Sequence, residues 1–99
     1  RAILSALVAS ARAADHITVW EGARLRAFIQ DTAGRVRGAV IETDGDLVQV
    51  IASAVVLATG GAGGLFGRTT TPVALKGEGL ALAWAAGAEI LDPEFVQFH

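Results

Sequence analysis

A glycine-rich turn is the segment of this chain that most clearly suggests contact with a ligand. An apolar run ends at Ala58 and passes directly into Thr59, Gly60 and Gly61. A glycine-rich turn after an apolar strand lets the backbone approach a cofactor, because a Cβ at these positions would collide with it. A turn that only changes the direction of the chain has the same composition, so the motif alone leaves both interpretations open.

Two side chains farther along the chain are candidate ligand-binding groups. Glu78 stands between Gly77 and Gly79 at the predicted start of a helix. Its carboxylate there either caps the helix or accepts a hydrogen bond from a cofactor hydroxyl. His99 follows an apolar segment, and a histidine in that position is either a hydrogen-bonded core residue or a ligand contact.

One arginine is a further candidate. Arg24 comes soon after residues 17–20, a β-branched and aromatic segment that we predict to be a short strand. Ligands of α/β folds bind beyond the carboxyl ends of strands, which is where Arg24 would lie. Arg26, Arg35 and Arg37 are instead expected on a solvent-exposed strand face.

The composition excludes several classes of function. There is no cysteine, so these 99 residues contain no disulfide, thiolate metal site or cysteine nucleophile, and we predict no metal site. The net charge of -2 gives no electrostatic basis for binding nucleic acid. No apolar run approaches the ~20 residues that span a bilayer, and none follows a basic start as in a signal peptide. We expect a cytoplasmic protein without direct membrane contact.

The chain is more apolar than an ordinary domain, with 53% hydrophobic and only 18% charged residues. A segment of a larger core has such a composition, because its buried faces pack against residues outside it. We therefore expect these residues, which begin at Arg1 and include no methionine, to be an internal piece of a longer polypeptide.

The predicted elements place the candidate residues in an α/β fold. Apolar residues at helical spacing predict a helix over 2–14, and a second helix is predicted near 78–86, ended by Gly87. Between the helices, turn residues separate three β-rich runs and predict an antiparallel meander over about 25–52. The continuously apolar run 55–58 predicts a strand buried on both faces of a parallel sheet.

This order of elements is typical of part of a Rossmann-like nucleotide-binding domain with an inserted antiparallel β-meander. Four stretches then carry a family resemblance, namely VVLATGGAGGLF, RTTTP, GEGLALAWAAGAEI and PEFVQFH. With them the whole chain resembles the flavoprotein family of L-aspartate oxidase, succinate dehydrogenase and fumarate reductase. Within the family, stretches 63–66 and 68–72 look most like L-aspartate oxidase. Thr71 replaces the usual asparagine, and Glu78 stands where an aspartate is commoner.

The resemblance implies a fold and an activity. Residues 1–88 would belong to an FAD-binding domain, and residues 89–99 would lead into the substrate (capping) domain. The enzyme would use FAD to convert L-aspartate to iminoaspartate in NAD biosynthesis and pass the electrons to O2 or fumarate. A quinolinate-forming enzyme acting downstream would be a partner.

The resemblance also implies residue roles. No catalytic residue is expected in these residues, because the family's catalytic arginines lie elsewhere. His99 would donate a hydrogen bond to a carboxylate of the dicarboxylate substrate. FAD would be contacted by the backbone of two residues near its adenine end and by residues of the glycine-rich turn and the second helix: Arg24, Leu25, Ala58, Thr59, Gly60, Gly61 and Glu78.

Two other interpretations fit the same residues. A succinate dehydrogenase or fumarate reductase flavoprotein subunit shares the cofactor and the dicarboxylate pocket. A non-catalytic nucleotide-binding module would also use an apolar strand followed by a glycine-rich turn, although it has no need of the terminal segment 94–99.

Overall fold

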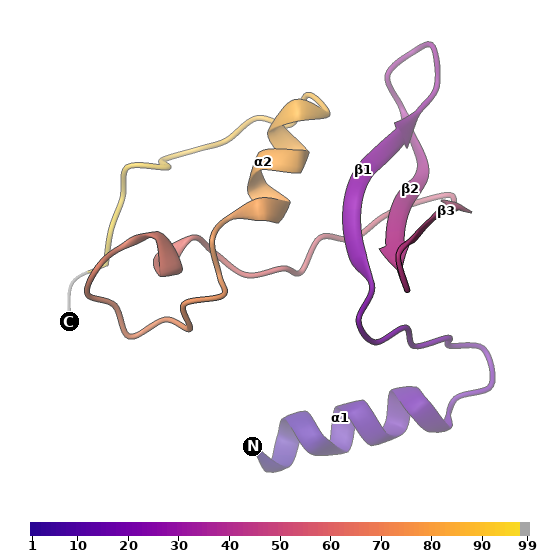
Figure 1. The fold of residues 1–99 in the computed structure, drawn as a ribbon, viewed down its shortest axis with the longest axis horizontal. Helices are drawn as coiled ribbons and strands as arrows, with labels where there is room; N and C mark the ends of the chain where they lie inside the picture. The colour runs from indigo at the N-terminus through magenta and orange to yellow at the C-terminus, as the bar shows by residue number, and fades with distance from the viewer. Residues whose placement is uncertain (98–99) are drawn as a thin grey trace.

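The computed structural model describes residues 1–97, and it contains two α-helices, one short 3-10 turn and one three-stranded sheet within that range (Figure 1). His99, the predicted substrate contact, lies outside the described residues. The elements in chain order are α1 (Ala2–Ala13), β1 (Arg24–Gln30), β2 (Val36–Thr43), β3 (Asp46–Ile51), the 3-10 turn η1 (Gly63–Leu65) and α2 (Glu78–Ala85).

The sheet confirms the predicted antiparallel meander. Its strand order is β1-β2-β3, and both neighbouring pairs are antiparallel. Asp44 and Gly45 join β2 to β3 with φ values of 50° and 81°. Positive φ at both central residues is the backbone of a type I′ turn, whose twist matches that of the two strands it connects. The Asp-Gly pair therefore fixes the register that places Thr43 opposite Asp46.

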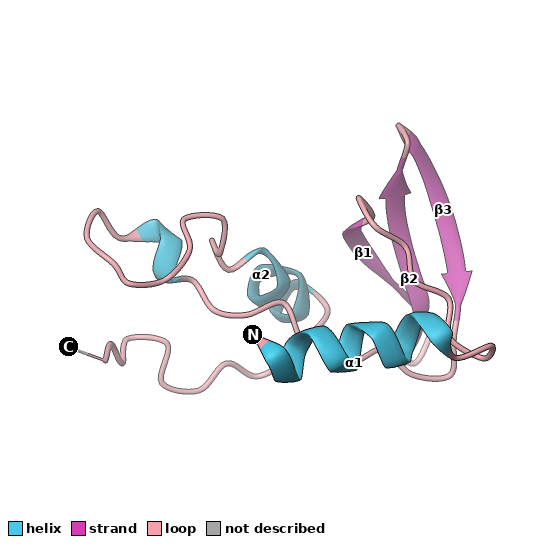
Figure 2. Ribbon diagram, turned by 90° about the horizontal axis from the view of Figure 1, so that it is seen from below, coloured by secondary structure: helices cyan, strands magenta, loops and turns pink. Residues whose placement is uncertain are grey.

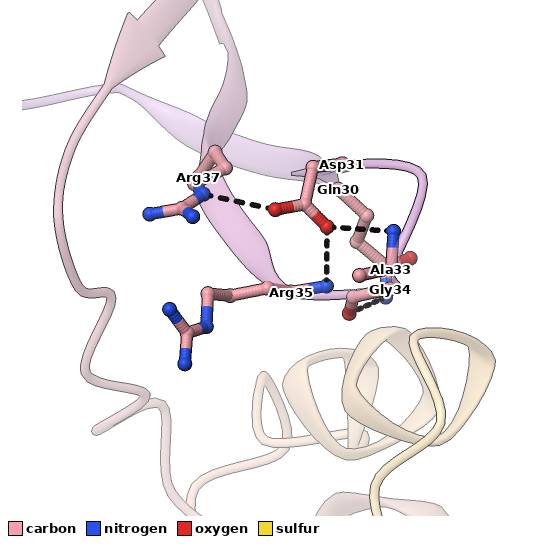
Figure 3. Close-up of polar contacts among 6 residues, drawn as sticks. All are labelled: Gln30, Asp31, Ala33, Gly34, Arg35 and Arg37. Atoms are coloured by element: carbon pink, nitrogen blue, oxygen red, sulfur yellow. Dashed lines mark hydrogen bonds and ion pairs between the residues drawn. The ribbon is translucent and has the colours of Figure 1, made fainter.

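A polar cluster closes the turn between β1 and β2 (Figure 3). The Asp31 carboxylate accepts hydrogen bonds from the backbone N–H groups of Ala33 and Arg35, both at 3.0 Å. Its other oxygen lies 3.1 Å from Nε of Arg37. The hydrogen bond from the Arg35 N–H, with help from Arg37 and Ala33, holds the pKa of Asp31 below its ordinary value, although partial desolvation opposes the shift.

The second helix also forms as predicted, and Gly87 ends it. Gly87 has a φ of 100°, its N–H donates to the Trp84 carbonyl at 3.0 Å, and the N–H of Ala88 donates to the Ala83 carbonyl at 3.0 Å. These two bonds around a left-handed glycine satisfy carbonyls that a helix end otherwise leaves without partners.

Two predicted strands are absent from the structure of residues 1–97. Residues 17–20 and 55–58 have no strand hydrogen bonding, and Val56 is 87% exposed. An extended segment becomes a strand only when a neighbour completes its ladder of hydrogen bonds. The described residues supply no such neighbour, so the predicted parallel sheet does not form among them.

The described residues have almost no core. Ala39, in the central strand β2, is the buried hydrophobic residue among residues 1–97, whereas Ile3 and Leu7 on α1 are 79% and 63% exposed. The elements are spread out rather than stacked in layers (Figures 1 and 2), and the radius of gyration is 15.8 Å. A compact domain of this length has a radius of about 13 Å. Neither helix described here is long and apolar enough to cross a membrane.

Asp31→Ala is expected to lower the urea midpoint of unfolding of the full-length protein at about pH 7. Because the folded-state pKa of Asp31 lies below its ordinary value of 3.8, the carboxylate stabilises the fold above that value. This stabilisation is lost as the pH falls through the folded-state pKa, so the difference from the wild type should shrink as the pH is lowered from about 7 to below 3.8. Asp15→Ala, in the loop after α1, is the control and should show little difference at either pH. A deficit of Asp31→Ala that is equal at both pH values would contradict this account.

Candidate functional site

Three segments that are far apart in the sequence form one cleft. The start of β1, the glycine-rich turn and the segment that enters α2 line a space of about 210 Å³. The cleft contains four of the predicted site residues, together with a lysine and a glycine that were not predicted: Arg24, Leu25, Thr59, Glu78, Lys76 and Gly79. Ala58, Gly60 and Gly61 do not line the cleft and are exposed on the adjoining turn.

A close contact fixes the distance between the glycine-rich turn and α2. Gly79 is buried in the first turn of α2, and a Cβ at that position would lie 2.0 Å from Oγ1 of Thr59. Real Cβ atoms do not approach an oxygen so closely, so a larger residue would require the Thr59 side chain to rotate or α2 to move away from it. Gly77, just before the helix, has a left-handed φ of 77° that favours glycine.

The glycine-rich turn has one closed side and one open side. Gly60 has a φ of 77°, and a Cβ on it would lie 3.2 Å from the Leu75 side chain. The N–H of Gly64 donates to the Leu75 carbonyl at 2.8 Å, which holds the turn against the segment before α2. A Cβ on Gly61 would meet nothing within 4 Å among the described residues. Gly61 therefore presents backbone to which another molecule has access.

An ion pair crosses the cleft. Nη2 of Arg24, at the start of β1, lies 2.6 Å from Oε1 of Glu78, at the start of α2. Both side chains are more than half exposed, so the pair contributes about 0.2–1 kcal/mol to stability. Within residues 1–97, no side chain caps the N-terminus of α2. Glu78 therefore does not act as a side-chain cap in this structure, and its carboxylate points toward β1 instead.

A second polar contact joins the other ends of the same two elements. Nε2 of Gln30, the last residue of β1, donates to the carbonyl of Ala86 at 2.9 Å and to that of Gly34 at 2.9 Å. Since Ala86 follows the last residue of α2, the helix is attached to β1 at both of its ends. Figure 1 shows α2 beside β1. This attachment brings Glu78 to the cleft.

Sequence reasoning missed Lys76 and Leu75, which also line the cleft. Lys76 directly precedes the Gly77-Glu78-Gly79 triplet. Its position as a charged residue next to a predicted helix start could have marked it as a candidate site residue. Leu75 gave no signal, because its position depends on the hydrogen bond from Gly64 rather than on any local pattern.

Comparison with known proteins identifies the family. The model of a family described as "FAD binding domain" matches residues 1–99. The chain belongs to this FAD binding domain family. It is 55% identical over 98 residues to L-aspartate oxidase of Caulobacter vibrioides, which covers 99% of this chain and 19% of the relative. No solved structure matches the chain significantly.

Further relatives of this FAD binding domain segment have the same name. The L-aspartate oxidase of Mesorhizobium japonicum is 45% identical over 100 residues, which covers 100% of this chain and 19% of the relative. That of Synechocystis sp. is 39% identical over 100 residues, which covers 100% of this chain and 18% of the relative. The chain thus spans less than a fifth of the length of these relatives.

The family match and the relatives point to FAD as the cofactor, and the cleft can be compared with what FAD requires. A volume of about 210 Å³ is smaller than the ~300–1,000 Å³ of typical ligand sites, so the cleft can enclose only part of a dinucleotide. The Glu78 carboxylate suits a hydroxyl donor, and the open backbone at Gly61 suits a flat group that approaches closely. These residues fit one portion of FAD.

Gly79→Ala is expected to destabilise the full-length protein by about 1–3 kcal/mol, because the added Cβ overlaps Thr59. Thermal unfolding of the apoprotein measures the effect. The matched control is Gly61→Ala, which adds the same methyl group where it meets no atom of residues 1–97 and should leave the apoprotein unfolding temperature unchanged. Equal unfolding temperatures for the two variants would show that the contact between Gly79 and Thr59 does not constrain α2.

Proposed function

We propose that this chain is the FAD-contacting segment of a longer FAD-dependent L-aspartate oxidase. The observation that carries the proposal is the match of 55% identity along 99% of the chain to a protein of that name. The cleft supports it, because Arg24, Leu25, Thr59 and Glu78 come together from separate segments. The exposed apolar side chains of residues 1–97 support the proposal of a longer polypeptide, since they need further packing partners.

Within this proposal the residues of the chain bind and orient the cofactor. Glu78 accepts a hydrogen bond from an FAD hydroxyl, and the backbone of Ala58, Thr59, Gly60 and Gly61 lies against the cofactor. The backbone groups of Arg24 and Leu25 lie near its adenine end. The absence of a Cβ at Gly61 and the left-handed backbone of Gly60 support such an approach.

The proposed reaction converts L-aspartate to iminoaspartate, with O2 or fumarate as the final electron acceptor. FAD, when bound, supplies the electron-accepting chemistry, and the protein supplies position and charge. His99 donates a hydrogen bond to a carboxylate of the dicarboxylate, which orients the substrate. We place the enzyme in the cytoplasm and in NAD biosynthesis, where a quinolinate-forming enzyme consumes its product.

The proposal includes the fold of the complete protein. Residues 1–88 belong to a Rossmann-like FAD-binding domain with the meander as an insert, and residues 89–99 lead into the substrate domain. Residues 55–58 become a strand when parallel neighbours from the rest of the polypeptide flank them. The exposure of Val56 supports this, because a continuously apolar segment is otherwise unfavourable in water.

Oxidation of L-aspartate by the full-length protein tests the proposal against its two alternatives. We expect reduction of bound FAD by L-aspartate and little reduction by succinate. Faster reduction by succinate would favour a succinate dehydrogenase or fumarate reductase subunit, and a flavin-free protein without either activity would favour a nucleotide-binding module. Three relatives named L-aspartate oxidase favour the first outcome.

His99→Ala in the full-length protein is expected to raise KM for L-aspartate strongly and to leave the FAD content nearly intact. A charge-assisted hydrogen bond to a carboxylate contributes about 1.5–3 kcal/mol, which corresponds to a factor of roughly 10–150 in binding. His16→Ala is the matched control, since His16 lies in the loop after α1 and lines no part of the cleft. Unchanged steady-state kinetics with aspartate and fumarate would exclude this role for His99.

A further inference from the structure

The contact with FAD implied for Arg24 uses only its backbone, but its guanidinium also has a partner in the cleft. Its Nη2 lies 2.6 Å from Oε1 of Glu78, and the two residues are 54 positions apart in the chain. The other oxygen of the same carboxylate has no hydrogen bond or ion pair within residues 1–97. One oxygen of Glu78 is thus held by β1, while the other remains available to a ligand.

The ion pair between Arg24 and Glu78 contributes little to the stability of the fold, so stability does not explain why the two side chains meet. Both side chains are more than half exposed, and water screens such a pair so that it stabilises a fold little. The contact does restrict the rotamers of a flexible carboxylate at the start of α2. A glutamate has one more rotatable bond than an aspartate, so fixing it before the ligand arrives removes an entropy cost from binding.

We propose that Arg24 is a positioning residue whose side chain orients the Glu78 carboxylate for FAD. The inference rests on the proposed role of Glu78 as the cofactor contact. Arg24 acts through one oxygen of Glu78, and the second oxygen accepts the hydrogen bond from the cofactor hydroxyl. The far end of α2 is held independently by the bond from Gln30 to Ala86, so loss of the Arg24 guanidinium frees the carboxylate without releasing the helix.

Titration of FAD into the full-length apoprotein measures the effect. We expect Arg24→Met to weaken FAD binding about three- to tenfold, the range set by one immobilised side chain. The unfolding temperature of the apoprotein should stay within a few degrees of that of the wild type, because the ion pair is exposed. Arg24→Lys keeps a positive charge but not the planar guanidinium, so it should restore part of the affinity.

The neighbouring ion pair on the same strand provides the matched control. Nη1 of Arg26 lies 3.9 Å from Oε2 of Glu42, and the Arg26 side chain is exposed to a similar extent. Arg26→Met removes an arginine from β1 without touching the cleft residues. It should leave the dissociation constant of FAD unchanged.

A double variant of Arg24→Met and Glu78→Ala distinguishes positioning of the Glu78 carboxylate from any other role of Arg24. If Arg24 acts through Glu78, Arg24→Met should add no further loss of FAD affinity in a Glu78→Ala background. An undiminished loss in that background, or a wild-type or tighter affinity of Arg24→Met alone, would overturn the inference. If Glu78→Ala itself leaves FAD affinity unchanged, the proposed cofactor contact of Glu78 fails, whereas oxidation of L-aspartate tests the proposed activity separately.

Discussion

The attachment of α2 along β1 is the constraint on which the candidate site depends. Residues near position 24, position 59 and position 78 share a cleft only because the helix lies beside the strand. Two polar contacts hold its ends, and a glycine in its first turn lets it approach the turn after residue 58. Neither polar contact is strong alone, since both involve exposed groups. The close approach at Gly79 supplies the steric part of the constraint.

The predictions from sequence that the structure confirms concern elements whose backbone hydrogen bonds form between residues close together in the chain. A helix satisfies its backbone hydrogen bonds within itself, and a hairpin does so with its neighbour in the chain, so α1, α2 and the meander could be predicted from spacing and turn residues. Residues 17–20 and 55–58 have strand-like composition but form no strand among the described residues. Their hydrogen-bonding partners would have to come from distant parts of a chain, and composition does not supply them.

The same distinction applies to the site. Thr59 and Glu78, which line the cleft, could be singled out because glycines and a lone carboxylate mark positions with unusual requirements, and their contact with a cofactor stays a prediction. The contact between Arg24 and Glu78 was not predictable, because it joins residues 54 positions apart and depends on how α2 meets β1. Leu75 reaches the cleft for the same reason, since a backbone hydrogen bond to Gly64 holds its segment there.

The cleft combines one acidic and two basic side chains, which suit different portions of FAD. The start of a helix attracts anions, but the first residue of α2 is itself an acid, Glu78. A phosphate beside Glu78 would meet a like charge, whereas a sugar hydroxyl can donate a hydrogen bond to it. The guanidinium of Arg24 pairs with one oxygen of this carboxylate. The cleft therefore offers a carboxylate acceptor from Glu78, which suits a sugar hydroxyl, and cationic donors from Arg24 and Lys76, which suit a phosphate.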